Sequence, residues 1–148
     1  MAIRVLVVSI LFLVAVGWAQ KKPTTNKPAA DPCAKAETQL EINQCTAAGF
    51  HDADKRLNEV YDRIVKSLQK DIDDARKQNY KDQINYNTTL LENLKKAQRA
   101  WLAYRDLHCA AARQKYEGGT IAPAIEMSCL QQVTDHRIEE LQDTYEKP

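Results

Sequence analysis

Apolar residues follow a helical spacing from the start of the folded part of the chain. From Thr38 onward they recur at steps of three and four, which places them on one face of a helix. The stretch T-Q-L-E at its start offers a capping box, with Thr38 at the N-cap and Glu41 three residues later. Residues 71–89 are polar and weakly patterned. We expect this helix to reach about Asp82 before the chain turns near Asn85–Asn87.

Two further helices are expected towards the C-terminus. A second Thr-x-x-Glu capping box, Thr89 to Glu92, predicts the start of a helix that runs to Tyr116. Gly118–Gly119 ends it, because a glycine can take the left-handed conformation of a C-cap. Pro123 suits the first turn of a last helix. No segment alternates like a strand, so the pattern predicts an all-α bundle of about three to four helices with a long helical hairpin.

The first 19 residues have the features of a secretory signal peptide. Arg4 precedes the apolar run Val5–Val16, and Gly17 and Ala19 are small residues suited to a cleavage site. The apolar run is shorter than the roughly 20 residues that a membrane-spanning helix needs, although an uncleaved anchor is the alternative. We therefore expect an exported protein, periplasmic or secreted, with no stable membrane anchor after cleavage.

The rest of the chain divides into a linker and one domain. Residues 20–32 are rich in lysine, proline and threonine and lack apolar periodicity, which predicts a flexible linker. Residues 33–148 then form a single small helical domain. All 20 acidic residues lie from Asp31 onward, whereas four of the 21 basic residues precede it, which leaves a formal charge of minus three. This charge excludes a typical nucleic-acid-binding protein and would suit a cationic partner.

Four cysteines in the exported part predict two disulfides. Cys109 lies nine residues before Gly118 and Cys129 lies ten after Gly119, so the two would be at equal heights in a helical hairpin. The remaining pair would close when the chain before the first helix folds back along it. We predict the pairs Cys33–Cys45 and Cys109–Cys129. A metal site is the competing interpretation, but no CxxC pair or histidine pair at ligand spacing supports it.

Residues 98–109, QRAWLAYRDLHC, put polar side chains on a face that should be buried. Gln98, Trp101 and Arg105 fall on one side of the helix. A buried arginine has to be paired, so we expect the Arg105 stem along Trp101 and its donors on a polar row of the first helix that begins at Asp54. The alternative is that Arg105 lines a binding surface. The polar layer, which would fix the register of the helices, comprises Asn58, Tyr61, Gln98, Trp101, Arg105, Asp106 and Arg137.

No set of residues predicts catalysis. The three histidines are scattered, and neither a serine nor a free thiol is paired with one of them in sequence. Glycines are too few for a phosphate-binding loop. Carboxylate pairs occur as on any polar helix, and a thin helical hairpin seldom forms the cleft that a glycosidase needs. We expect neither enzymatic activity nor a cofactor or metal.

A spaced series of residues runs through nearly the whole folded part. It comprises Cys33, Thr38, Glu41, Cys45, Ala53, Leu57, Asn58, Tyr61, Gln98, Trp101, Arg105, Asp106, Cys109, Gly118, Gly119, Cys129, Thr134, Arg137 and Leu141. In this order and spacing the series resembles the LprI-type lysozyme-inhibitor family of small exported bacterial proteins. The resemblance implies a location in the bacterial envelope, a helical fold and a protein partner, with a lysozyme as the candidate that would be bound and inhibited.

Two functions of different classes therefore stay open. The first is an inhibitor that occludes the active-site cleft of a lysozyme-like hydrolase, and the second is an envelope interaction or scaffold module of the same fold. An exposed acidic or hydroxyl-bearing loop would favour the first function. A broad apolar stripe left over after the bundle closes would favour the second. No residue is assigned to an inhibitory contact.

We predict that the signal peptidase cleaves after Ala19. The reason is the order of positive n-region, short apolar core and small residues at the cleavage site. The intact mass of the protein purified from its native envelope should correspond to an N-terminus at Gln20. A purified chain that still carries Met1 would contradict the signal peptide.

Overall fold

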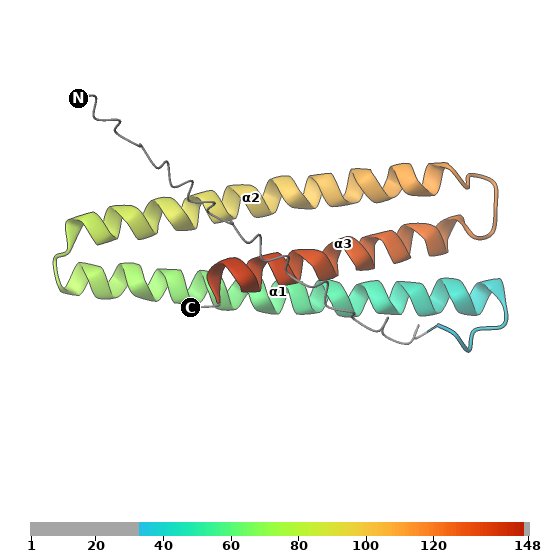
Figure 1. Ribbon diagram of the computed structural model, residues 1–148, viewed down its shortest axis with the longest axis horizontal. Helices are drawn as coiled ribbons and strands as arrows, with labels where there is room; N and C mark the ends of the chain where they lie inside the picture. Colours follow the sequence, from blue (N-terminus) through green and yellow to red (C-terminus); the bar gives the residue numbers. More distant parts are fainter. Residues whose placement is uncertain (1–32, 147–148) are drawn as a thin grey trace, which may run out of the picture.

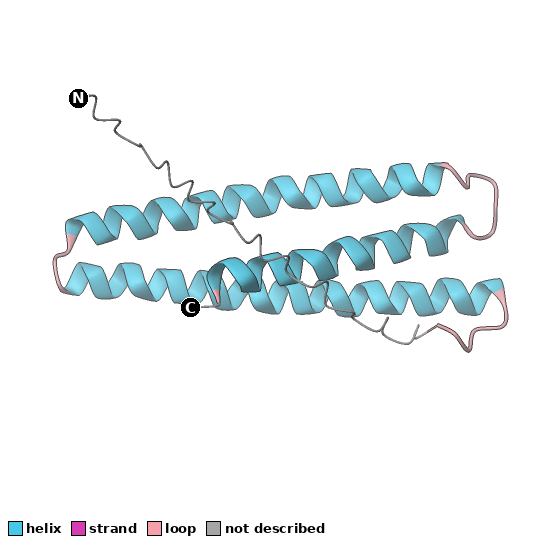
Figure 2. Cartoon of the chain, viewed as in Figure 1, coloured by secondary structure: helices cyan, strands magenta, loops and turns pink. Residues whose placement is uncertain are grey.

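The computed structural model describes residues 33–146, which form three helices: α1 (Gln39–Lys77), α2 (Lys81–Gln114) and α3 (Ala122–Tyr145). In Figure 1, α1 and α2 lie side by side as a long hairpin, and α3 turns back along the half that contains the start of α1. Figure 2 shows helices joined by short loops, with no strand among the described residues. The predicted all-α bundle with a long hairpin is confirmed, and the number of helices is three.

The predicted signal peptide, residues 1–19, and linker, residues 20–32, lie outside the described residues. Within residues 33–146, no helix combines the length and the apolar composition needed to cross a membrane.

The predicted capping box at the start of α1 is confirmed. Thr38 has an extended backbone, and its hydroxyl accepts a hydrogen bond from the Glu41 amide at 3.2 Å. In return, the Glu41 carboxylate accepts bonds from the Thr38 and Glu37 amides, each at 2.9 Å. These backbone bonds hold the pKa of Glu41 below its ordinary value, and the bond from the Thr38 amide has the largest effect. Two of the amides that a helix start leaves without a partner, those of Thr38 and Glu41, are thereby satisfied, and so is the Glu37 amide just before the helix.

The prediction that α1 reaches Asp82 and turns near Asn85–Asn87 was wrong, because Asn79 ends the helix earlier. Asn79 has a φ of 56°, the left-handed conformation that asparagine tolerates better than most residues. Its amide donates to the Arg76 carbonyl at 3.1 Å, and the next amide donates to the Ala75 carbonyl at 3.0 Å. This pair of bonds is a Schellman C-cap.

The predicted start of the second helix at Thr89 was also wrong. α2 begins at Lys81, and its N-cap makes no side-chain hydrogen bond, so Thr89 and Glu92 lie well inside the helix. Asn87 is buried in α2 and accepts a bond from the Gln83 amide group at 3.1 Å, instead of forming a turn. A Thr-x-x-Glu pattern also occurs by chance on a polar helix, so the pattern does not by itself mark a helix start.

A narrow core joins the three helices. Gly49 lies inside α1 without breaking it, because the Gln131 side chain of α3 packs against the space that a Cβ atom would occupy. Close contact between α1 and α3 therefore explains a glycine that the pattern alone treats as a possible break. The buried cluster that all three helices share comprises Leu57, Val60, Ile64, Leu94, Ile138 and Leu141.

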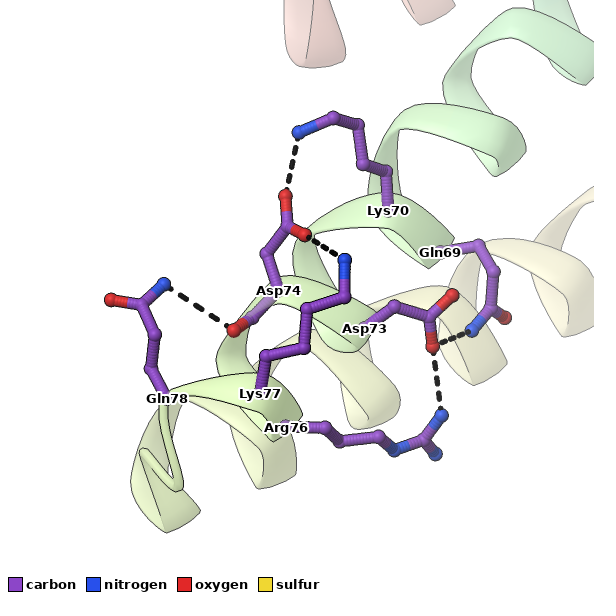
Figure 3. Close-up of polar contacts among 7 residues, drawn as sticks. All are labelled: Gln69, Lys70, Asp73, Asp74, Arg76, Lys77 and Gln78. Carbon is purple, nitrogen blue, oxygen red and sulfur yellow. Dashed lines mark hydrogen bonds and ion pairs between the residues drawn. The ribbon is translucent and has the colours of Figure 1, made fainter.

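The far end of the hairpin extends beyond α3 (Figure 1). Near the end of α1, Asp74 accepts from the Lys70 and Lys77 ammonium groups at 2.6 and 2.9 Å (Figure 3). These two contacts lower the pKa of Asp74 to about 2. Asp73 is paired with Arg76 at 3.0 Å. Exposed pairs of this kind, three and four residues apart, support the last turns of a helix that packs only on α2 there.

We predict that Thr38→Ala lowers the free energy of unfolding by about 1 kcal/mol, because the N-cap bond to Glu41 is lost. The matched control is Thr89→Ala, which removes the same hydroxyl from the interior of α2. It should change stability by no more than about 0.5 kcal/mol. Chemical denaturation measures both values. Equal losses for the two variants would contradict the observed boundaries of α1 and α2.

Candidate functional site

The first candidate is the polar cluster around Arg105, where α1 faces α2. The Arg105 side chain is buried, and its Nη1 donates to Asp54 Oδ1 of α1 at 2.8 Å. Its Nε donates to the neighbouring Asp106 carboxylate at 2.9 Å. The guanidinium carbon lies 5.3 Å from the centre of the Phe50 ring and 5.2 Å from that of Trp101. Arg105 is therefore paired and also held between two aromatic side chains.

A second arginine joins α3 to the same tryptophan. The Arg137 guanidinium carbon lies 5.8 Å from the centre of the Trp101 ring. Its Nε donates to Gln98 Oε1 of α2 at 3.2 Å, and its Nη1 pairs with Glu140 at 3.0 Å. Two guanidinium groups therefore lie over the Trp101 ring. Arg105 is paired with Asp54 of α1, and Arg137 belongs to α3. All three helices meet in this cluster.

The remaining members of the predicted polar layer lie at its edge. Asn58 is exposed and donates to Asp54 at 3.4 Å, so it reaches Arg105 only through that carboxylate. Tyr61 packs against the shared core, and burial raises the pKa of its hydroxyl. Phe50 was missed by the sequence analysis, although it lies one helical turn before Asp54 and so shares its side of α1. We propose that this cluster sets the register of the helices, because its donors and acceptors are engaged with one another.

The second candidate is the loop between α2 and α3, residues 115–121, which we call the α2–α3 loop. All its residues are exposed. Gly118 has a φ of 83°, the left-handed conformation that favours glycine, as the sequence predicts for one of the two glycines. The Gly119 amide donates to the Tyr116 carbonyl at 3.0 Å, and the Asn43 side chain of α1 donates to the Thr120 carbonyl at 3.3 Å. The loop is thus fastened to the start of α1.

Two disulfides brace the end of the bundle that carries this loop. They join Cys33 to Cys45 and Cys109 to Cys129, with Cα atoms 5.7 and 5.5 Å apart. These are the pairs that the sequence analysis predicts from helical heights. Nearer the loop, Arg113 of α2 is paired with Glu126 of α3 at 2.8 Å. Covalent and ionic links therefore hold both sides of the loop in place.

The α2–α3 loop presents an acidic group and two hydroxyl groups at the tip of the bundle. Glu117 precedes the two glycines, and Tyr116 and Thr120 carry the hydroxyl groups. Ile121, which follows, remains 42% exposed. From the sequence the two glycines predict only a helix stop, although the types of the flanking residues are visible there. Among residues 33–146 no cluster of three or more His, Cys, Asp or Glu side chains could hold a metal ion.

Comparison with known proteins identifies the family. The family described as Lysozyme inhibitor LprI matches residues 29–141, which is most of the chain. The protein belongs to the LprI family. It is also similar to an uncharacterized protein of Rhizobium meliloti (strain 1021), with 35% identity over 120 residues that cover 77% of this chain and 78% of the relative. No solved structure matches the chain. The predicted family resemblance is confirmed.

We predict that Arg105→Met lowers the free energy of unfolding by about 1 kcal/mol and Arg105→Ala by about 2–3 kcal/mol. Methionine keeps the packing of the stem against the two rings, whereas alanine also loses that packing. Both variants leave Asp54 without its arginine, but its side chain is 36% exposed and water can solvate it.

Denaturant midpoints of both variants measure this difference. The exposed Arg99→Ala, on the same helix, is the control and should stay within about 0.5 kcal/mol of the wild type. Midpoints of both Arg105 variants near that of the wild type would show that Arg105 adds no stability. The alternative that Arg105 serves a binding surface would then gain support.

Proposed function

We propose that this LprI-family protein binds and inhibits a lysozyme-type cell-wall hydrolase in the bacterial envelope. The observation that carries the proposal is the family match over residues 29–141 to a family described as a lysozyme inhibitor. Inhibition would be reversible, because both pairs of cysteines among the described residues are joined in disulfides and leave no free thiol to react. We also propose that the protein has no catalytic activity of its own and works outside the cytoplasm after loss of its signal peptide.

The α2–α3 loop is the surface we propose for the inhibitory contact. It projects from one end of the bundle and carries Glu117 between two hydroxyl-bearing residues, which suits a cleft built to bind carbohydrate hydroxyl groups. Its backbone is held by the Asn43 contact and the neighbouring disulfide. A loop that is already ordered loses little conformational entropy on binding. An exposed loop with acidic and hydroxyl-bearing residues is the feature expected of an inhibitor that enters a carbohydrate-binding cleft.

Charge supports the encounter but supplies little of the affinity. Many lysozymes are cationic, so the acidic excess of the folded part would increase the association rate by electrostatic steering. A formal charge of minus three is small, and the tight part of the binding must come from a shaped contact that excludes substrate. We therefore expect binding to weaken as salt is added, without being abolished by salt alone.

An envelope interaction module is the second candidate function. The observation that favours it is a row of exposed, uncharged residues along α2, including Tyr86, Tyr104 and Leu107, which are 65%, 56% and 73% exposed. Large exposed apolar patches mark surfaces that bind other proteins. This row lies along α2 and does not overlap the α2–α3 loop, so substitutions can test the two surfaces separately.

The test of the proposed function is lysis of a cell-wall substrate by lysozymes of several classes in the presence of excess protein, with direct titration at low and high salt. We expect inhibition of at least one lysozyme. Glu117→Lys should weaken binding about tenfold or more, because it reverses the charge within the proposed contact. Glu92→Lys, the matched control, makes the same charge change at an exposed position in the middle of α2. It should reduce only the steering contribution, by about twofold.

Two outcomes would contradict different parts of this proposal. No inhibition by the wild type across the panel, together with no binding at low salt, would contradict the inhibitor function and leave the interaction module ahead. Inhibition that Glu117→Lys and Glu92→Lys weaken equally would keep the function but remove the α2–α3 loop from the contact.

A further inference from the structure

α2 carries a row of uncharged residues that its own bundle leaves uncovered. We call it the α2 stripe. One half of its positions are Leu90, Ala97, Tyr104 and Ala111, spaced seven apart. The other half are Tyr86, Asn93, Ala100 and Leu107, also spaced seven apart. Leu90 is half-buried and the others are exposed, whereas the core of the bundle uses a different side of the helix.

The spacing of the α2 stripe is that of a helix pair. Its positions follow one another at alternating steps of four and three, which average 3.5 residues. A row with this period stays in contact with a second helix as the two wind around each other with a left-handed twist. The positions span about 37 Å of helix, at 1.5 Å per residue. A row of this length and spacing fits a helix as its partner, and none of the three described helices covers it.

The α2 stripe is complementary to itself when one copy runs antiparallel to another. If the two-fold axis passes between Ala97 and Ala100, these small residues face each other at the centre and let the helices approach closely. On either side, Leu90 of one copy then lies level with Leu107 of the other. A two-fold symmetric contact between identical chains requires a surface that is complementary to itself, and the stripe meets this requirement in the antiparallel direction.

The outer layers of the same alignment are matched in size and polarity. The Asn93 amide lies level with the Tyr104 hydroxyl of the second copy, where each can hydrogen-bond the other. Tyr86 lies level with the small Ala111, so a large side chain meets a small one. A parallel pair would instead place each residue opposite itself, with tyrosine on tyrosine in two layers and alanine on alanine in three. The antiparallel arrangement distributes volume more evenly and is the one the residues favour.

The surface of the protein has a hollow where this alignment puts a leucine. The hollow is lined by Asn85, Tyr86, Thr89, Leu90 and Asn93. Four of these, at positions 86, 89, 90 and 93, have the spacing of a hole in knobs-into-holes packing. The residue of an antiparallel second copy at that height is Leu107, which is 73% exposed in the single chain. The knob and the hole are thus both present on one molecule, at positions related by the same two-fold axis.

We propose that the α2 stripe is a self-association surface, through which two copies of this chain form an antiparallel, two-fold symmetric dimer. None of its eight residues is charged, and Lys96 at its border would lie near Ala103 of the second copy, so no like charges meet. The stripe offers on the order of 400 Å² per copy, about half of the roughly 800 Å² that each partner contributes to a standard protein interface. The dimer is therefore weak, with a dissociation constant of roughly 10–1,000 μM.

Sedimentation equilibrium of the processed full-length chain, from about 10 μM to about 1 mM, tests the proposal. We expect the average mass to rise from that of a monomer towards that of a dimer. Ala100→Glu places two like charges beside the two-fold axis and should weaken the dimer at least about tenfold. Ala48→Glu, the control, adds the same charge at an exposed alanine of α1, away from the stripe, and should have little effect.

A compensating variant tests the direction of the helices. In the antiparallel dimer Ala97 faces Ala100 of the other copy, so the double variant Ala97→Lys, Ala100→Glu should regain the association that Ala100→Glu loses. In a parallel dimer the double variant would place like charges opposite each other in both layers and would not recover.

The proposal is overturned by a wild type that stays monomeric at the highest concentration. It is also overturned if Ala100→Glu and Ala48→Glu have equal effects, or if the double variant fails to recover. A monomeric wild type whose binding to a lysozyme is lost in Ala100→Glu would assign the α2 stripe to the hydrolase instead. Because the inhibition assay uses the α2–α3 loop variants, failure of the dimer leaves the proposed inhibitor function untouched.

Discussion

Three helices of unequal length can bury only a narrow row of side chains between them, and the rest of this structure follows from that constraint. The shared core is six residues drawn from α1, α2 and α3. A core of this size leaves the helices able to slide or rotate against one another unless other contacts prevent it. The Cys109–Cys129 disulfide, which joins α2 to α3, and the two arginines on Trp101, which link all three helices, supply such contacts.

Sequence reasoning succeeds where one local rule determines the outcome. The capping box at Thr38 needs only two residues three apart, and the pairing of Cys109 with Cys129 needs only their distances from the glycine turn. Sequence reasoning fails at the turn between α1 and α2, because several asparagines near it are each suited to a turn. Asn79 and Asn87 are both suited to a left-handed turn, and the choice between them depends on which register lets Ile72 and Leu91 reach the buried side of the hairpin. That choice is made by tertiary packing, which a local pattern does not contain.

The polar cluster was predicted in part for a related reason. That Arg105 must find a carboxylate on α1 follows from the cost of a buried charge, and Asp54 is in helical register with the apolar positions of α1. Arg137 was part of the predicted layer, but its contact with Trp101 depends on where α3 lies. The contact of Phe50 with Arg105 depends on how α1 is rotated. The α2–α3 loop shows the opposite case, since its residue types were visible but their exposure at the end of the bundle became apparent only with the positions of α1 and α3.

The unequal helix lengths also divide the molecule into two regions of different resistance to opening. One end holds both disulfides, the α2–α3 loop and the start of α1, tied by the Asn43 contact. The other end is a two-helix projection with no disulfide, a few buried side chains such as Ile72 and Ala75, and exposed ion pairs along its last turns. Thermal fluctuations should open this projection first, as a separate cooperative unit. The end proposed to meet a hydrolase would then keep its shape while the opposite end frays and re-forms, so that local unfolding of the projection leaves the proposed binding surface intact.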